Sequence, residues 1–227
     1  MNNELTEIAF ILDRSGSMQS LTDAAITGFN SFLDDQLDAP GEARLTLVLF
    51  DNEYILHANR APLKEVQKLD TLSYVPRGTT ALLDAIGRTI ESIGAKLSCA
   101  PEKDRPGSVT IAIYTDGYEN ASTDYSATRI REMIKHQTKQ YNWQFLFLAA
   151  NEDAIATAAH YGIDKNNAAQ VLFSQTGMHS STQSISRKVK ASRIRCSEVW
   201  NDDELAKDAD VDLSEIVAEE TKKQADA

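Results

Sequence analysis

Three short stretches of the chain combine aspartate with hydroxyl-bearing side chains. The candidate ligand residues are Asp13, Ser15 and Ser17 in DRSGS, Thr79 and Thr80 in GTT, and Asp116 in TDG. Carboxylate and hydroxyl oxygens are the ligands that hard cations prefer, Mg²⁺ first and then Ca²⁺ or Mn²⁺. Each stretch alone is also typical of a helix cap or a plain turn, because Asp, Ser and Thr favour both. The stretches therefore indicate a metal site only if the fold brings them together.

Short apolar runs separated by helical spacing predict the fold that positions these stretches. The expected strands are Ile8–Leu12, Leu45–Phe50, an edge strand within DNEYILHA (51–58), Val109–Tyr114, Phe145–Leu148 and Ala169–Phe173. Most of these runs are apolar throughout, as in a parallel sheet covered on both faces. The segments between them place apolar residues at helical spacing. The pattern predicts an α/β fold: a doubly wound, mostly parallel six-stranded sheet with one antiparallel edge strand and helices on both faces.

The DRSGS and TDG stretches each follow a predicted strand. Both should therefore lie at the carboxyl edge of the sheet, where open α/β folds bind their ligands. The order of the three Asp/Ser/Thr elements, together with the order of strands and helices, resembles the metal-ion-dependent adhesion site of von Willebrand factor A-type (VWA) domains. The resemblance covers roughly Leu5 to Phe173. It implies a Rossmann-like VWA fold that holds Mg²⁺, with Ca²⁺ or Mn²⁺ able to substitute.

The resemblance assigns roles to individual residues. The five implied metal ligands are Asp13, Ser15, Ser17, Thr80 and Asp116. Thr80 is the expected threonine because it stands two positions after Gly78, and Thr79 is the alternative. The sixth ligand would be an Asp or Glu carboxylate of a partner protein. The residues expected at the rim of the site, where they would contribute to partner choice, are Arg14, Thr79, Tyr118, Glu119 and Asn120.

The function implied by the resemblance is a non-catalytic, metal-dependent protein-interaction module, an adaptor, and two alternatives stay open. The first is a metal-dependent hydrolase or phosphotransfer enzyme. No glycine motif for phosphate or dinucleotide binding follows the first strand, and a phosphatase of the haloacid-dehalogenase type would need an aspartate where Ser15 stands. Glu119 is the nearest candidate general base, although a solvated acid is the simpler interpretation. The second alternative is a scaffold that needs no metal.

Composition narrows the class of partner. The formal net charge of −11 argues against nucleic-acid binding, because no basic excess is present to neutralise phosphates. Cys99 and Cys196 are too few for a disulfide framework or a zinc site and are most simply reduced thiols. No apolar run approaches the roughly 20 residues that span a bilayer, and acids stand where a signal peptide would be basic. We therefore expect a cytoplasmic protein of bacterial or phage type that binds no membrane.

We expect residues 1–200 to form the VWA domain, including a final basic helix, and residues 201–227 to form a flexible acidic tail. The tail carries ten Asp or Glu and three Lys. It is either a solubilising segment or, within DLSEIVAEETKKQ, a helix that docks on a partner. One of its carboxylates could also reach a metal, which would allow self-association. The basic residues of the preceding helix, most simply a solvated face, are Arg187, Lys188, Lys190, Arg193 and Arg195.

Overall fold

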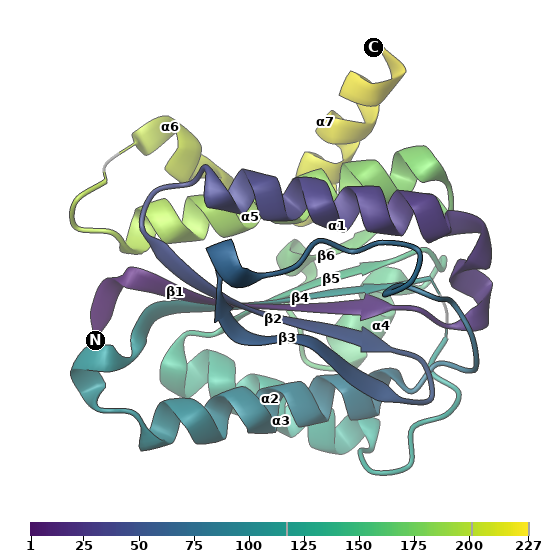
Figure 1. Ribbon diagram of the computed structural model, residues 1–227, viewed down its shortest axis with the longest axis horizontal. Helices are drawn as coiled ribbons and strands as arrows, with labels where there is room; N and C mark the ends of the chain where they lie inside the picture. The colour runs from purple at the N-terminus through teal and green to yellow at the C-terminus, as the bar shows by residue number, and fades with distance from the viewer. Residues whose placement is uncertain (117, 201, 227) are drawn as a thin grey trace.

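The computed structural model describes residues 1–116, 118–200 and 202–226, and it contains the predicted six-stranded sheet (Figure 1). The strands are β1 (Asn2–Asp13), β2 (Glu42–Phe50), β3 (Tyr54–Pro62), β4 (Pro106–Thr115), β5 (Gln144–Ala149) and β6 (Ala168–Gln170). Their order across the sheet is β3-β2-β1-β4-β5-β6. Only the β2–β3 pair is antiparallel, and β3 is an edge strand. The expected fold class is confirmed.

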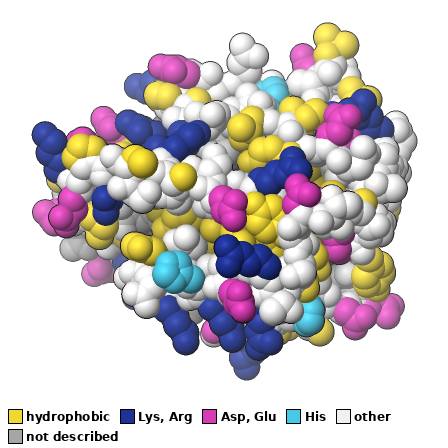
Figure 2. All heavy atoms as spheres, turned by 90° about the horizontal axis from the view of Figure 1, so that it is seen from below, with side chains coloured by type: hydrophobic (Ala, Val, Ile, Leu, Met, Phe, Trp, Pro, Cys, Tyr) yellow, Lys and Arg dark blue, Asp and Glu magenta, His cyan; other side chains and the backbone are white. Residues whose placement is uncertain are grey.

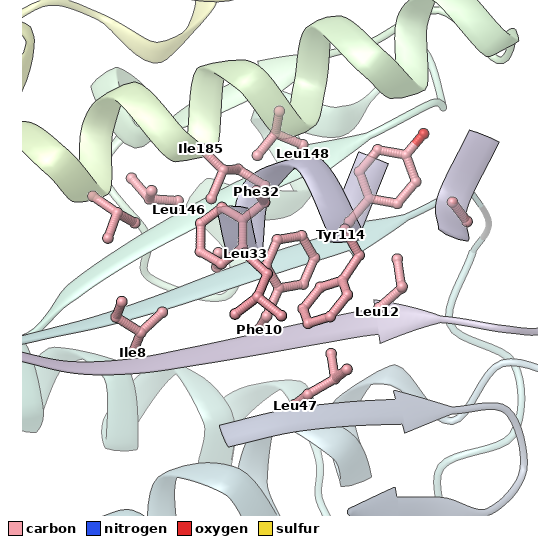
Figure 3. Packing of buried hydrophobic residues seen from close by; sticks show 14 of the residues in the cluster. Ile8, Phe10, Leu12, Phe32, Leu33, Leu47, Tyr114, Leu146, Leu148 and Ile185 are labelled. Carbon is pink, nitrogen blue, oxygen red and sulfur yellow. The ribbon is translucent and has the colours of Figure 1, made fainter. Parts of the chain in front are cut away.

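Helices cover both faces of the sheet. One face carries α1 (Thr22–Leu37), α5 (Gln175–Cys196), α6 (Asp203–Ala206) and α7 (Leu213–Ala225), and the other carries α2 (Leu82–Cys99), α3 (Ala127–Tyr141) and α4 (Ala154–His160). Successive side chains of β1 point to opposite faces of the sheet, as strand geometry requires. Phe10 belongs to the cluster under α1 and α5, where its ring lies 5.1 Å from that of Phe32 (Figure 3). Ile11 belongs to the cluster under α2 and α3. The central strand is therefore buried on both sides.

The carboxyl ends of the central strands meet at one edge of the sheet. Asp13 at the end of β1 pairs in register with Phe50 at the end of β2, and Leu12 pairs with Tyr114 of β4. Because β2 and β4 flank β1 on opposite sides, the strand order reverses here, which is the usual position of a ligand site in a doubly wound sheet. The loops after β1, β2 and β4 therefore lie side by side.

The C-terminal segment differs from the expected flexible tail. Its described residues form α6 and α7, and α7 packs on α5. Leu213 and Val217 are buried in the cluster that also contains Ile185 and Val189 of α5. Ile216 is buried as well, outside that cluster. The spacing of these three residues places them on one face of the helix. The segment packs against the domain despite its acidic composition, because packing buries this apolar face.

The basic face of α5 also differs from the expectation of a solvated surface. Arg187 forms ion pairs with Asp208, Glu219 and Glu220 at 2.8 to 2.9 Å. Lys188 is buried and donates to the carbonyl oxygen of Ala209 at 3.1 Å. Burial lowers the pKa of this lysine. The C-terminal segment therefore supplies the partners of Arg187 and Lys188, and it also pairs with Arg195, whereas Lys190 and Arg193 contact α1 and the loop that follows it.

Figure 2 shows the molecule from below the view of Figure 1, from the side that carries α2 and α3, where hydrophobic side chains lie between Lys, Arg, Asp and Glu. A cavity of about 350 Å³ at this face is lined by Leu97, Val109 and Trp143, close to the amino ends of β4 and β5. Within the described ranges, no helix has the length and apolar character needed to cross a membrane. Cys99 and Cys196 are free.

Candidate metal centre

The loop after β1 is organised by the carboxylate of Asp13. One oxygen of this buried side chain accepts a hydrogen bond from the backbone N–H of Ser15 at 2.7 Å, and the other accepts from the hydroxyl of Thr115 at 2.6 Å. The first bond turns the chain sharply after the strand. As a result, the hydroxyl of Ser15 lies 3.1 Å from that of Ser17. The two serines of DRSGS thus present their oxygens together.

The loop after β4 brings a second carboxylate to the same point. The hydroxyl of Ser17 donates to Oδ1 of Asp116 at 3.0 Å. Burial raises the pKa of Asp13 to about 6, and the negative charge of Asp116 adds to this effect. Burial also raises the pKa of Asp116. Among the described residues, no Lys, Arg or His forms an ion pair with either carboxylate. The site therefore concentrates negative charge that the chain itself does not neutralise.

The second loop places Thr80 beside these groups. It is joined to the first loop by the backbone N–H of Gly16, which donates to the carbonyl oxygen of Gly78 at 3.2 Å. Thr80 is buried, whereas Thr79 is exposed. No hydrogen bond to the hydroxyl of Thr80 is found in the described part of the chain. Thr80 rather than Thr79 is therefore the threonine whose position suits an inward-facing ligand.

A plain capping role for Thr80 does not fit the structure. Helix α2 begins at Leu82, and its first amide groups are capped from another loop. The N–H of Leu83 donates to Glu119 at 2.9 Å, and the N–H of Asp84 donates to the hydroxyl of Ser122 at 3.0 Å. Since side chains 36 and 38 residues away satisfy these donors, the helix does not need the threonine hydroxyl.

Three of the five expected rim residues make contacts within the chain: Arg14 is buried, Glu119 is half-buried and Asn120 is exposed. Arg14 is buried and forms an ion pair with the carboxylate of Asp51 at 2.9 Å, because its backbone follows β1 alongside the end of β2. Asn120 accepts from the N–H of Thr80 at 2.9 Å. The third residue, Glu119, accepts from four donors, including Leu83 N–H. The burial of Arg14 contradicts its predicted rim position, whereas the rim positions of Glu119 and Asn120 stay predictions.

The other two expected rim residues, Thr79 and Tyr118, are exposed, and the side chain of Tyr118 is 62% exposed.

The donor set fits a hard divalent cation. Its members are Asp13, Ser15, Ser17 and Asp116, which hydrogen-bond in series, and Thr80 on the adjoining loop. All are oxygen donors, and two are acids whose mutual repulsion a cation would relieve. No cluster of three or more His, Cys, Asp or Glu that could hold a metal occurs among the described residues. A metal here would therefore depend on the hydroxyl groups as well as on the two carboxylates.

Several supporting residues were not foreseen from the sequence. Tyr74 is fully buried, and its hydroxyl donates to the carbonyl oxygen of Asp13 at 2.6 Å. The buried carboxylate of Asp51 pairs with Arg14 and Arg77. Thr115 contacts Asp13 directly. The positions of Asp51 and Thr115 at strand ends were a usable signal, whereas nothing local marks Tyr74.

Comparisons with known proteins bear on the fold. No family model matches the sequence, and no curated protein matches it. Among solved structures, a D319A mutant of the PilB minor pilin from Streptococcus sanguinis has 12% identity and a TM-score of 0.58, with coverage of 84% of this chain and 62% of that one. A von Willebrand factor type A protein from Catenulispora acidiphila has 13% identity and a TM-score of 0.55, with coverage of 82% and 42%.

A third similar structure is proximal thread matrix protein 1 from the mussel byssus, with a zinc-occupied MIDAS motif. It has 14% identity and a TM-score of 0.59, with coverage of 80% of this chain and 47% of that one. The chain thus spans less than two thirds of the length of each of these three proteins. At these identities the likeness concerns the fold. Together with the strand order and the site geometry, it shows that this chain has the von Willebrand factor A-type fold.

Proposed function

We propose that the protein is a divalent-metal-dependent protein-interaction module that binds a carboxylate of a partner protein. The observation that carries this proposal is the convergence of hydroxyl and carboxylate oxygens from the loops after β1 and β4, with Thr80 beside them. Serine and threonine hydroxyls are neutral ligands. Two carboxylates balance the charge of a divalent ion, but an ion that they hold through water keeps an inner shell of neutral hydroxyls and water and stays attractive to one more anion. We propose Mg²⁺ as the metal, and the zinc-occupied motif of the byssus protein supports a divalent ion in general.

The surface beside the proposed metal suits a protein partner. Leu72 is 87% exposed, and Val75 is also exposed. Both belong to the segment that Tyr74 anchors to the carbonyl oxygen of Asp13. Tyr118 is exposed in the third loop. We propose that Tyr118, with Leu72 and Val75 beside the site, contacts the partner next to its carboxylate in place of the buried Arg14, since tyrosine is among the residues that dominate interface energies.

A hydrolase or phosphotransfer role is less well supported. Glu119 was the candidate general base, but each of its carboxylate oxygens already accepts two hydrogen bonds, from Leu83, Ala121 and Ser122. A base that is fully occupied as an acceptor is poorly placed to take a proton from water. A cytoplasmic location is also a proposal, supported by the two free cysteines.

Metal binding can be tested by calorimetry and thermal unfolding with Mg²⁺ or Mn²⁺ against a chelator. The wild type should bind one ion, and at an ion concentration of 100 times Kd the free energy of unfolding should rise by about 2.7 kcal/mol. Thr80→Ala and the double variant Ser15→Ala/Ser17→Ala should lose most of this gain. Thr79→Ala is the matched control and should behave as the wild type. Binding that survives in the double variant would refute the proposed site.

Partner binding is tested by affinity capture with and without chelator. We expect partners that are retained only by the metal-loaded wild type. Capture that is equal in Mg²⁺, in chelator and with Ser15→Ala/Ser17→Ala would instead favour a metal-independent scaffold. Turnover of a phosphoester that disappears in Asp116→Ala would favour an enzyme.

A further inference from the structure

The loop after β4 reaches across to the loop that carries Thr80, and one residue makes the junction. The side-chain oxygen of Asn120 accepts from the N–H of Thr80 at 2.9 Å, and the N–H of Asn120 donates to the carbonyl oxygen of Thr80 at 3.1 Å. Both main-chain polar groups of the threonine are therefore held by a single residue 40 positions away. This reciprocal pair fixes the position and the orientation of the Thr80 backbone.

The surrounding backbone gives Thr80 little support of its own. Gly78 has a positive φ of 67°, and Ala81 lies outside the helical region with φ −95° and ψ 62°. Thr80 thus belongs to an irregular segment between a turn and the first residue of α2. On its other side the segment is held by the N–H of Ala81, which donates to the carbonyl oxygen of Asp51 at 2.9 Å. Asn120 therefore holds Thr80 itself, and Asp51 holds the residue that follows it.

The same loop is fixed to the start of α2 by further contacts. Glu119 accepts from the N–H of Leu83 at 2.9 Å. In the reverse direction, the carboxylate of Asp84 in the first turn of α2 accepts from the N–H groups of Thr123, Asp124 and Tyr125, each at 3.0 Å. The loop and the amino end of α2 consequently form one unit. Asn120 lies within a framework that holds it steady against Thr80.

We propose that Asn120 is a positioning residue for the metal site, a role that rests on the proposed function. By holding the backbone of Thr80 it sets the hydroxyl at a fixed place relative to Asp116, which lies four residues before Asn120 in the same loop. In a well-formed metal site the ligand distances lie within about 0.2 Å of their standard values. The residues that orient metal ligands typically change the affinity about 10- to 100-fold when they are replaced.

Two substitutions at this position separate positioning from general stability. Asn120→Ala removes the acceptor of the Thr80 N–H, whereas Asn120→Asp keeps an acceptor oxygen at the same place. Calorimetry with Mn²⁺ or Mg²⁺ should show that Asn120→Ala lowers the affinity about 10- to 100-fold. Asn120→Asp should bind as tightly as the wild type or more tightly. Because the side chain is exposed, the midpoint of thermal unfolding in chelator should stay close to the wild-type value for both.

Asp124→Ala provides the matched control. Asp124 lies in the same loop, is exposed and pairs with Arg88, but it does not contact Thr80. Its replacement should leave the metal affinity unchanged. If Asn120→Ala bound metal like the wild type, or if Asn120→Asp were as weak as Asn120→Ala, the positioning role would be wrong. Failure of the proposed function looks different: the wild type would bind no ion, or Ser15→Ala/Ser17→Ala would bind as well as the wild type.

Discussion

The C-terminal helix α7 should be part of the cooperative fold, although its composition is that of a solubilising tail. Leu213 is 0% exposed and belongs to the same cluster as Val171, which directly follows β6, and Val189 of α5. Leu213→Ala would remove a buried side chain from an interior that can relax only in part. The expected loss in the free energy of unfolding is about 2–5 kcal/mol.

Deletion of the whole helix should be more severe. It would expose the surface now covered by Leu213, Ile216 and Val217. At about 1.5–3 kcal/mol for each buried apolar side chain, the loss is roughly 5–9 kcal/mol. A typical domain has a total stability of about 5–15 kcal/mol. A chain that ends before Leu213 should therefore be unfolded or close to unfolding. A loss of partner binding in such a chain would then report loss of the fold and not a role of the C-terminal segment in binding.

Urea unfolding followed by circular dichroism measures both effects. Leu205→Ala is the matched control, because Leu205 belongs to the same C-terminal segment but is 50% exposed. Its replacement should change the free energy of unfolding by less than about 0.5 kcal/mol. Equal unfolding midpoints for Leu213→Ala, Leu205→Ala and the wild type would refute the packing of α7 on α5. Cooperative unfolding of the shortened chain at the wild-type midpoint would refute it as well.

Two further predictions concern the backbone of the second loop and a buried acid. Gly78→Ala should cost about 1–2 kcal/mol, because φ is 67° there, and should lower the melting midpoint in chelator by roughly 2–8 °C. A new Cβ would also overlap the side chain of Asn52, so Asn52→Ala/Gly78→Ala separates the two causes and should recover little if backbone strain dominates. Burial raises the pKa of Glu7 above its ordinary value of 4.5, despite the opposing effect of Arg60. The stability that Glu7 contributes should therefore be complete below pH 4.5 and should decrease as the pH rises through the raised value. Urea titrations of the wild type and of Glu7→Gln, repeated at intervals of about one pH unit from roughly pH 4 to pH 8, measure this dependence. A stability difference between the two proteins that does not change with pH would contradict it.

The sheet could be predicted because its strands are apolar on both faces. The run Ile8–Leu12 marks β1, but the strand extends from Asn2 to Asp13. Thr6 and Glu7 are buried in its first half, and Glu7 pairs with Arg60 of β3 at 2.9 Å. Polar residues in a buried strand depend on partners from distant segments. Hydrophobic periodicity cannot show such partners, so it underestimates the length of the strand.

The candidate ligands could be located because each follows a strand or precedes a helix at the same edge of the sheet. The roles of Arg14 and Glu119 could not, because they depend on Asp51 and on the amide of Leu83, which are distant in the sequence. For α7, the apolar spacing of Leu213 and Ile216 was visible, but acidic composition alone does not distinguish a flexible tail from a helix that pairs with a basic neighbour.

The contacts among the three loops form a closed ring, and this has a consequence for partner choice. The first loop joins the second through Gly16 and Gly78, the second joins the third through Thr80 and Asn120, and the third returns to the first through the Ser17–Asp116 bond. Each loop is thus held by both of the others, so the ligand oxygens are arranged before any ion binds. The loops should therefore lose little conformational entropy when an ion binds. The Ser17 hydroxyl and the Asn120 side-chain oxygen are already engaged in this ring. If the protein binds a partner as proposed, we expect selectivity beyond the shared carboxylate to come mainly from the exposed side chains beside the site, Leu72, Val75 and Tyr118.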